Sequence, residues 1–151
     1  MLLNIYNQKI IIQDNLYVQF TLDSLTSKKS LMYHDLIIEH MHYFEKNHIP
    51  VWILSHDSVK QIKTISSLYS NRCHYICSPD LSYFQKNGYI KDKIIFGKSY
   101  PIIYIECKVM HKNKCIYKAN RINEKSILNA YFKALDILYI EYKKNIKKKL
   151  T

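Results

Sequence analysis

The sequence predicts an α/β (α+β) fold, with a mixed central sheet flanked by helices in one domain over residues 1–151. Several short segments alternate apolar and polar residues, as strands with one buried face do. Longer segments repeat apolar residues every three or four positions, as on one face of a helix. Hydrophobic residues make up 48% of the chain, and no apolar run approaches the roughly 18 residues that span a membrane. A globular domain without a membrane segment is therefore expected.

The first half of the chain predicts a hairpin and a helix. Residues 3 to 12 and 16 to 22 are rich in β-forming residues and are separated by the turn pair Asp14-Asn15, so they predict an N-terminal β-hairpin. Asn47 and Pro50 end the helix that is predicted from about residue 30. Its apolar positions recur at helical spacing: Tyr33, Leu36, Ile37, Met41 and Phe44.

A short strand and a second helix follow. Residues 51 to 54 predict the strand, and apolar residues from Val59 to Tyr69 predict the helix. Ser55-His56-Asp57 precedes it, but three neighbouring residues cannot converge as a hydrolase triad does, because their side chains point apart. Ser55 or Asp57 is expected to cap this helix instead.

The second half predicts strands and a closing helix. Strands are expected over residues 73–77, 94–96, 101–109 and 115–119, with turns at Asn87-Gly88 and at residues 97–99. Asn123 is expected to cap a final helix with an apolar stripe up to Tyr142, followed by a lysine-rich tail. Lysines in the last turn of a helix complement its dipole.

Glycine content and the N-terminal residues limit the function classes. Gly88 and Gly97 are the two glycines of the chain, which excludes the glycine-rich phosphate loops of Rossmann and P-loop proteins. The first residues lack the basic flank and cleavage site of a secretory signal. A cytoplasmic or nuclear location is therefore expected.

The charge of the chain favours a polyanionic partner. Lysine and arginine number 23 against 12 acidic residues, a formal net charge of +11. Such an excess favours nucleic acid ahead of an acidic membrane surface. The lysines expected to contact nucleic acid are Lys98, Lys112, Lys114, Lys125, Lys147 and Lys148.

Four cysteines raise the question of a zinc site. Cys73, Cys77, Cys107 and Cys115, with His74 or His111, could supply ligands. However, their spacings do not match the paired C-x₂₋₄-C pattern of strong zinc motifs. Reduced and mostly buried thiols in strands are the favoured interpretation.

Charged residues end the strongest predicted strand. Glu106 and Lys108 share one face of it, and a charge in a buried strand is costly unless it is paired with another group, a metal ion or a phosphate. Pro79-Asp80 lies upstream. Glu39 and His42 also have the spacing of a carboxylate and imidazole pair on one helix face, which is usually solvated surface.

Pro79-Asp80 followed by Glu106-Cys107-Lys108 after an apolar strand resembles the PD-(D/E)xK superfamily of restriction-endonuclease-like nucleases. The resemblance implies a metal-dependent endonuclease, a hydrolase of phosphodiester bonds with a restriction-endonuclease-like core. It implies that Asp80 and Glu106 bind Mg²⁺ or Mn²⁺, that Lys108 acts in catalysis, and that Glu39, or Asp35 in its place, is an outer metal contact. The alternative is a structural role, with Asp80 in a turn and Glu106 and Lys108 as an ion pair.

Two non-enzymatic alternatives remain open. Strands over residues 100–109 and 115–119, followed by a helix, resemble the second half of a double-stranded RNA-binding domain. That resemblance implies a non-catalytic RNA- or DNA-binding protein. The 14 tyrosines suit interfaces as well as cores, so a subunit of a larger assembly, including a homodimer, is the other possibility.

Overall fold

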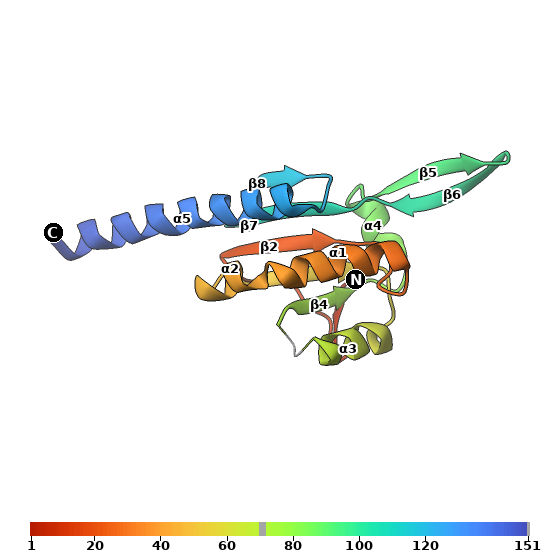
Figure 1. Cartoon of the computed structure of the whole chain (residues 1–151), viewed down its shortest axis with the longest axis horizontal. Helices are drawn as coiled ribbons and strands as arrows, with labels where there is room; N and C mark the ends of the chain where they lie inside the picture. Colours follow the sequence, from red (N-terminus) through yellow and green to blue (C-terminus); the bar gives the residue numbers. More distant parts are fainter. Residues whose placement is uncertain (70–71, 151) are drawn as a thin grey trace.

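The computed structural model describes residues 1–69 and 72–150 and is built around a six-stranded mixed sheet (Figure 1). The strand order is β1-β4-β3-β2-β7-β8. The strands are β1 (Leu3–Asn4), β2 (Leu16–Thr21), β3 (Val51–Ser55), β4 (His74–Cys77), β7 (Glu106–His111) and β8 (Lys114–Ala119). Strands β2, β3 and β4 are parallel, and the outer strands β1, β7 and β8 pair antiparallel.

Helices connect the parallel strands, because parallel neighbours require a crossover rather than a tight turn. The chain passes from β2 through α1 (Lys28–Glu39) and α2 (Met41–Lys46) to β3, and from β3 through α3 (Val59–Leu68) to β4. The short α4 (Ser82–Lys86) and the long α5 (Glu124–Leu150) complete the helices of the described chain. Ser58 caps α3 in a capping box with Gln61.

Alternation along the strands gives the sheet two apolar faces. One face, which we call the helix face, carries Val18, Phe20, Ile53 and Val109 and packs against residues of α1, α2, α3 and α5. The other, the open face, carries Tyr17, Trp52, Leu54 and Ile76 and packs against Phe84 of α4 and against Tyr89. The open face has less helical cover, so polar groups on it can reach solvent.

A second, two-stranded sheet projects from the body as an arm. Strands β5 (Ile90–Ile95) and β6 (Lys98–Ile103) pair antiparallel and extend away from the six-stranded sheet (Figure 1). Phe96 and Gly97 form its turn with φ angles of 51° and 74°, the left-handed region that two-residue hairpin turns require. Phe96 at the tip is fully exposed.

The prediction of a mixed α/β architecture with helices flanking a central sheet is confirmed, but parts of it are wrong. The N-terminal β-hairpin does not form, because β1 pairs with β4, and β2 pairs with β3 and β7. The strand expected over residues 101–109 is divided between β6 of the arm and β7 of the sheet. The predicted helix from residue 30 to 47 is interrupted at His40, between α1 and α2.

The closing helix is longer than its predicted apolar stripe. Helix α5 continues through the lysine-rich tail to Leu150, and its C-terminal half extends beyond the sheet, at the end of the molecule opposite the arm (Figure 1). Within residues 1–69 and 72–150, no helix combines the length and the apolar composition needed to cross a membrane.

Candidate functional site

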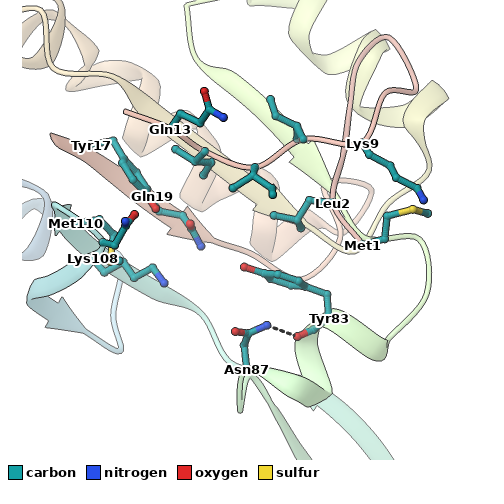
Figure 2. A pocket seen from close by; sticks show the side chains of 14 residues that line it. Met1, Leu2, Lys9, Gln13, Tyr17, Gln19, Tyr83, Asn87, Lys108 and Met110 are labelled. Atoms are coloured by element: carbon teal, nitrogen blue, oxygen red, sulfur yellow. Dashed lines mark hydrogen bonds between the residues drawn. The ribbon is translucent and has the colours of Figure 1, made fainter. Parts of the chain in front are cut away.

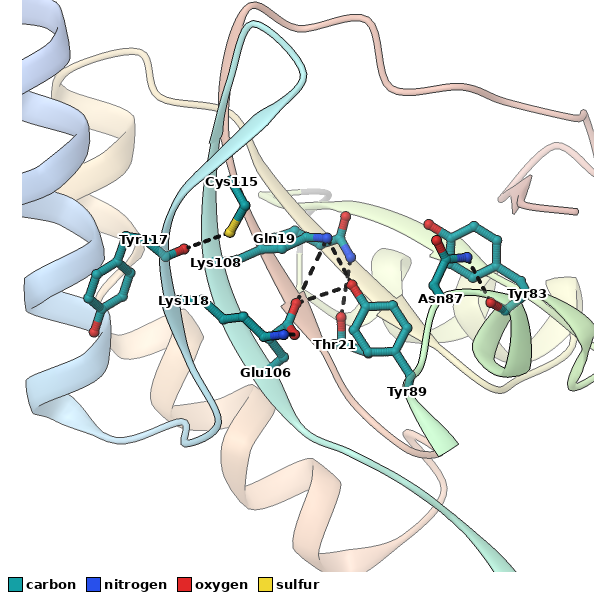
Figure 3. Close-up of polar contacts among 10 residues, drawn as sticks. All are labelled: Gln19, Thr21, Tyr83, Asn87, Tyr89, Glu106, Lys108, Cys115, Tyr117 and Lys118. Carbon is teal, nitrogen blue, oxygen red and sulfur yellow. Dashed lines mark hydrogen bonds and ion pairs between the residues drawn. The ribbon is translucent and has the colours of Figure 1, made fainter. Parts of the chain in front are cut away.

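A buried charged cluster lies on the open face, where β7 begins. Glu106 is 3% exposed; its carboxylate accepts a hydrogen bond from the Tyr89 hydroxyl at 3.1 Å. Lys108 donates to the same hydroxyl at 2.8 Å and lies 3.8 Å from the Glu106 carboxylate. Lys118 of β8 lies 3.3 Å from the second carboxylate oxygen (Figure 3). We call these four residues the Glu106 cluster.

The cluster holds two cations around one carboxylate, so it carries a net positive charge. Burial, followed by the nearby Glu106 carboxylate, raises the pKa of the Tyr89 phenol above its ordinary value, so Tyr89 stays protonated and can donate. These contacts satisfy the polar groups that the end of this strand would otherwise bury unpaired.

An open pocket of about 790 Å³ lies next to the cluster, between the sheet, α4 and the N-terminal segment (Figure 2). We call it the lysine pocket. The side chains of Tyr83, Leu2 and Lys108 point into it from three separate segments of the chain. Its described lining contains two lysines and no acidic residue: Met1, Leu2, Lys9, Ile10, Ile11, Ile12, Gln13, Tyr17, Gln19, Tyr83, Asn87, Lys108, Met110 and Asn113.

The four cysteines divide into buried and exposed thiols. Cys73, Cys77 and Cys107 are buried. Burial raises the pKa of Cys73 and of Cys107 to about 12, and that of Cys77 to about 11. Because the thiolate is the reactive form, these three thiols are unreactive at neutral pH. The prediction that most of the thiols are buried is confirmed for these three.

Cys115 is the exposed thiol, and it lies beside the lysine pocket. In the β7–β8 register Cys115 is opposite Met110, which lines the pocket, just as Lys118 is opposite Lys108. Opposed residues of antiparallel strands point to the same face of the sheet. Figure 3 shows the Cys115 side chain on the Lys108 side of β8, where its thiol donates a hydrogen bond to the Tyr117 carbonyl at 3.3 Å.

Helix N-termini, where the dipole can lower a thiol pKa, carry no cysteine in the described chain. Helix α1 begins after its N-cap Ser27, whose hydroxyl accepts from the Ser30 amide, and its first turn holds Lys28 and Lys29. Helix α3 begins after Ser58 in the same manner. The exposed Cys115 lies within strand β8 instead.

The residues predicted to bind a metal ion do not lie together in the structure. Asp80 follows β4, and Glu106 begins β7; β3 and β2 lie between these strands. Three strand spacings of about 4.8 Å separate β4 from β7 by roughly 14 Å. Asp80 is exposed and accepts from the Ser82 amide at 3.1 Å. Hydrogen bonds from the Ser82 hydroxyl and amide lower the Asp80 pKa, as in a turn residue.

Glu39 and Asp35 belong to α1, which lies on the other side of the sheet from the Glu106 cluster. Glu39 is the last residue of α1 and is exposed, and α1 covers the helix face, opposite the face that carries the Glu106 cluster. Asp35 accepts a hydrogen bond from the Tyr69 hydroxyl at 2.9 Å. Across residues 1–69 and 72–150, no three histidine, cysteine, aspartate or glutamate side chains are grouped so that they could hold a metal ion.

The predicted nucleic-acid lysines occupy separate regions. Lys112, Lys147 and Lys148 line one shallow hollow beside the C-terminal part of α5. Lys98 begins β6 of the arm, and Lys125 lies in the first turn of α5. Lys114 begins β8. Lys98 and Lys125 therefore lie on other elements than the Lys112, Lys147 and Lys148 group.

Comparison with known proteins yields no matching family model and no matching curated protein. Solved structures do match. The bacterioferritin comigratory protein of Xanthomonas campestris has a TM-score of 0.68 at 16% identity, over 82% of this chain and 79% of that one. A peroxiredoxin-like protein from Aquifex aeolicus has 0.69 at 14% identity, over 88% and 81%. Peroxidoxin BcpB from Mycobacterium tuberculosis has 0.65 at 11% identity, over 84% and 88%.

These matches overturn the nuclease interpretation. The restriction-endonuclease-like resemblance is wrong, because the solved structures that share this fold are peroxiredoxins and because Asp80 is remote from Glu106. The predicted endonuclease activity, the nucleic-acid-binding alternatives and the Mg²⁺ or Mn²⁺ cofactor are wrong with it. The short motif suggested a nuclease, but Glu106 and Lys108 form an ion pair, as the alternative structural interpretation of the motif predicted.

Sequence reasoning missed Tyr89 and Lys118 as neighbours of Glu106, and it missed the exposed Cys115 beside the lysine pocket. The i, i+2 spacing of Glu106 and Lys108 indicated a shared face, but β8 and the segment after α4 complete the cluster, and their pairing is a tertiary feature. At 11 to 16% identity, these similarities describe the architecture alone. The chain shares the architecture of these solved structures, a thioredoxin-like fold.

Proposed function

We propose that this chain reduces an organic hydroperoxide with the thiol of Cys115 and holds the organic group in the lysine pocket. The observation that carries the proposal is the position of Cys115, an exposed thiol on the sheet face that also forms the pocket. The likeness to peroxiredoxins supports it, since one such protein, from Xanthomonas campestris, is described by its alkyl peroxide reduction activity.

The surroundings of Cys115 suit a substrate that has a polar head group and an apolar body. Lys114 precedes it in β8, and Lys108 and Lys118 lie on the same side of the β7–β8 pair. The apolar wall formed by Leu2, Ile10 and Met110 suits an alkyl or aryl group.

The reaction transfers one oxygen atom. The Cys115 thiolate attacks the terminal oxygen of the hydroperoxide; a sulfur–oxygen bond forms as the oxygen–oxygen bond breaks, and the alkoxide leaves. The alkoxide takes one proton to become an alcohol, and Cys115 is left as a sulfenic acid. Lys108 lies beside the pocket and is placed to stabilise the departing alkoxide.

An external thiol must complete the cycle. The other three cysteines are buried, so none of them can reach Cys115 without opening the core. One external thiol condenses with the sulfenic acid to give a mixed disulfide and water. A second thiol then reduces this disulfide and restores the Cys115 thiol.

Peroxide consumption with an external dithiol is the direct test. Wild type is expected to consume cumene hydroperoxide, whereas Cys115→Ser is expected to lose essentially all of the protein-dependent rate. Lys108→Met is expected to slow the reaction roughly tenfold or more through weaker charge stabilisation. Lys60→Met, on the exposed surface of α3, is the matched control and should leave the rate unchanged. A Cys115→Ser rate equal to wild type would exclude the proposal.

A second candidate function is the binding of an organic acid without chemistry. It is favoured by the two lysines and the absence of acidic residues in the described lining of the lysine pocket. Octanoate is a suitable probe, because its carboxylate can pair with Lys108 while its chain contacts Leu2 and Ile10. Calorimetry should then show saturable binding that Lys108→Met weakens and Cys115→Ser leaves intact. Saturable binding together with no peroxide consumption would favour this candidate over the first.

A further inference from the structure

We propose that two copies of this chain associate through their α5 helices, packed antiparallel along an apolar seam that faces away from the sheet. The seam comprises Leu128, Phe132, Leu135, Tyr139, Tyr142 and Ile146. This proposal is independent of the proposed reaction at Cys115.

The seam is distinct from the face by which α5 packs on its own sheet. Ile127, Ala130 and Ala134 are buried in the core on the helix face. At 100° per residue, the seam lies roughly 120° around the helix from these residues. Phe132, Tyr139 and Tyr142 are between 55% and 63% exposed. Ile146 is 37% exposed, whereas Leu128 and Leu135 are partly buried, so the described chain leaves most of this stripe open to a partner.

The spacing of the seam is that of a coiled coil. Successive members from Leu128 to Ile146 are four, three, four, three and four residues apart, which is the alternation of a and d positions in a heptad repeat. Helix α5 is 27 residues long, which gives it a length of roughly 40 Å. The first half of the helix is already packed on the sheet. Pairing with a second copy therefore does not have to provide the free energy of helix formation.

The distribution of charge along α5 favours antiparallel over parallel pairing of two copies. The last turns contain five lysines: Lys143, Lys144, Lys147, Lys148 and Lys149. Parallel pairing would place these two groups side by side, which is unfavourable. Antiparallel pairing centred between Tyr139 and Tyr142 packs Leu135 on Ile146 of the second copy. It also brings Asp136 beside Lys143 of the second copy, twice by symmetry.

The geometry of the body permits this arrangement. The C-terminal half of α5 extends beyond the sheet, so it is free to lie along the first half of the same helix in another copy (Figure 1). From Tyr142 to Leu150 every residue is exposed. A self-complementary patch of this kind closes as a twofold dimer rather than growing into a filament.

Sedimentation velocity of the full chain over a micromolar concentration series tests the proposal. Wild type is expected to shift from monomer to dimer as concentration rises. The double variant Tyr139→Asp, Ile146→Asp should stay monomeric at every concentration. Ile140→Asp is the matched control, because Ile140 is 48% exposed on α5 but lies outside the seam; it should dimerise as wild type does.

Charge reversal tests the direction of pairing. Asp136→Lys alone and Lys143→Asp alone should each weaken the dimer, and the two together should restore it, because the opposite charges then meet again across the interface. A wild-type chain that remains monomeric throughout would overturn the proposal. So would a dimer that survives the seam variant, or a double charge reversal that restores nothing.

Discussion

Glu106→Ala is expected to lower the free energy of unfolding by about 3 kcal/mol, because it leaves the half-buried Lys108 ammonium without its carboxylate. Tyr89 also loses the acceptor of its hydroxyl, and Lys118 loses its partner. Because Lys108 borders the lysine pocket, water can partly hydrate its ammonium group. The loss of unfolding free energy is therefore expected at the low end of the range for broken buried ion pairs. Urea denaturation of purified protein measures this loss.

Two further variants test whether the loss of stability in Glu106→Ala comes from breaking the ion pair with Lys108. Asp80→Ala should change stability far less than Glu106→Ala, because Asp80 is exposed and contacts its own turn. The double variant Glu106→Leu, Lys108→Met should be more stable than Glu106→Ala, since it removes the unpaired charge together with its partner. Equal losses for Asp80→Ala and Glu106→Ala would contradict this account of the cluster.

Stability is expected to fall by about 3 kcal/mol as the pH falls from 6.5 to 4, through His34. His34 is fully buried in α1, with one ring nitrogen 2.6 Å from the Tyr75 hydroxyl. Burial lowers its pKa from 6.5 to about 4, an effect that the neighbouring Asp35 partly opposes. The unfolded chain therefore binds a proton between these pH values when the folded chain does not, so acid favours unfolding.

Urea denaturation at a series of pH values measures this contribution. His34→Gln keeps a polar group that can reach Tyr75 and should remove most of the His34 slope between pH 4 and 6.5. His42→Gln, at an exposed position of α2, is the control and should keep the wild-type slope. If His34→Gln and wild type lose stability in parallel, a group other than His34 is responsible.

Local patterns predicted α3, α5, the region of α1 and α2, and most of the strands, because each depends on neighbouring residues, but they missed the short α4. Alternation identified β2 through Val18 and Phe20, and helical spacing identified α3 through Ile62. The false hairpin arose because Asp14-Asn15 has turn chemistry, whereas the partner of β2 is chosen by burial on both faces of the sheet. A strand that is central and parallel cannot be identified from its turn residues.

The site was harder to predict because its members meet only through strand pairing. Glu106 and Lys108 were identified as a same-face pair, yet the same residues carried the nuclease resemblance. Tyr89 lies 17 residues from Glu106 and hydrogen-bonds to it, while Cys115 reaches the pocket face because β8 pairs with β7 and sets it opposite Met110. Neither contact has a signal in the spacing of the residues along the chain.

Mass spectrometry after addition of one equivalent of cumene hydroperoxide tests the central claim most directly, because it identifies the reacting sulfur atom. The account predicts the gain of one oxygen atom at Cys115, trapped as a dimedone adduct, with Cys73, Cys77 and Cys107 unmodified. In Cys115→Ser the adduct should be absent. An unmodified Cys115 under these conditions, or an adduct on one of the buried thiols instead, would contradict the account.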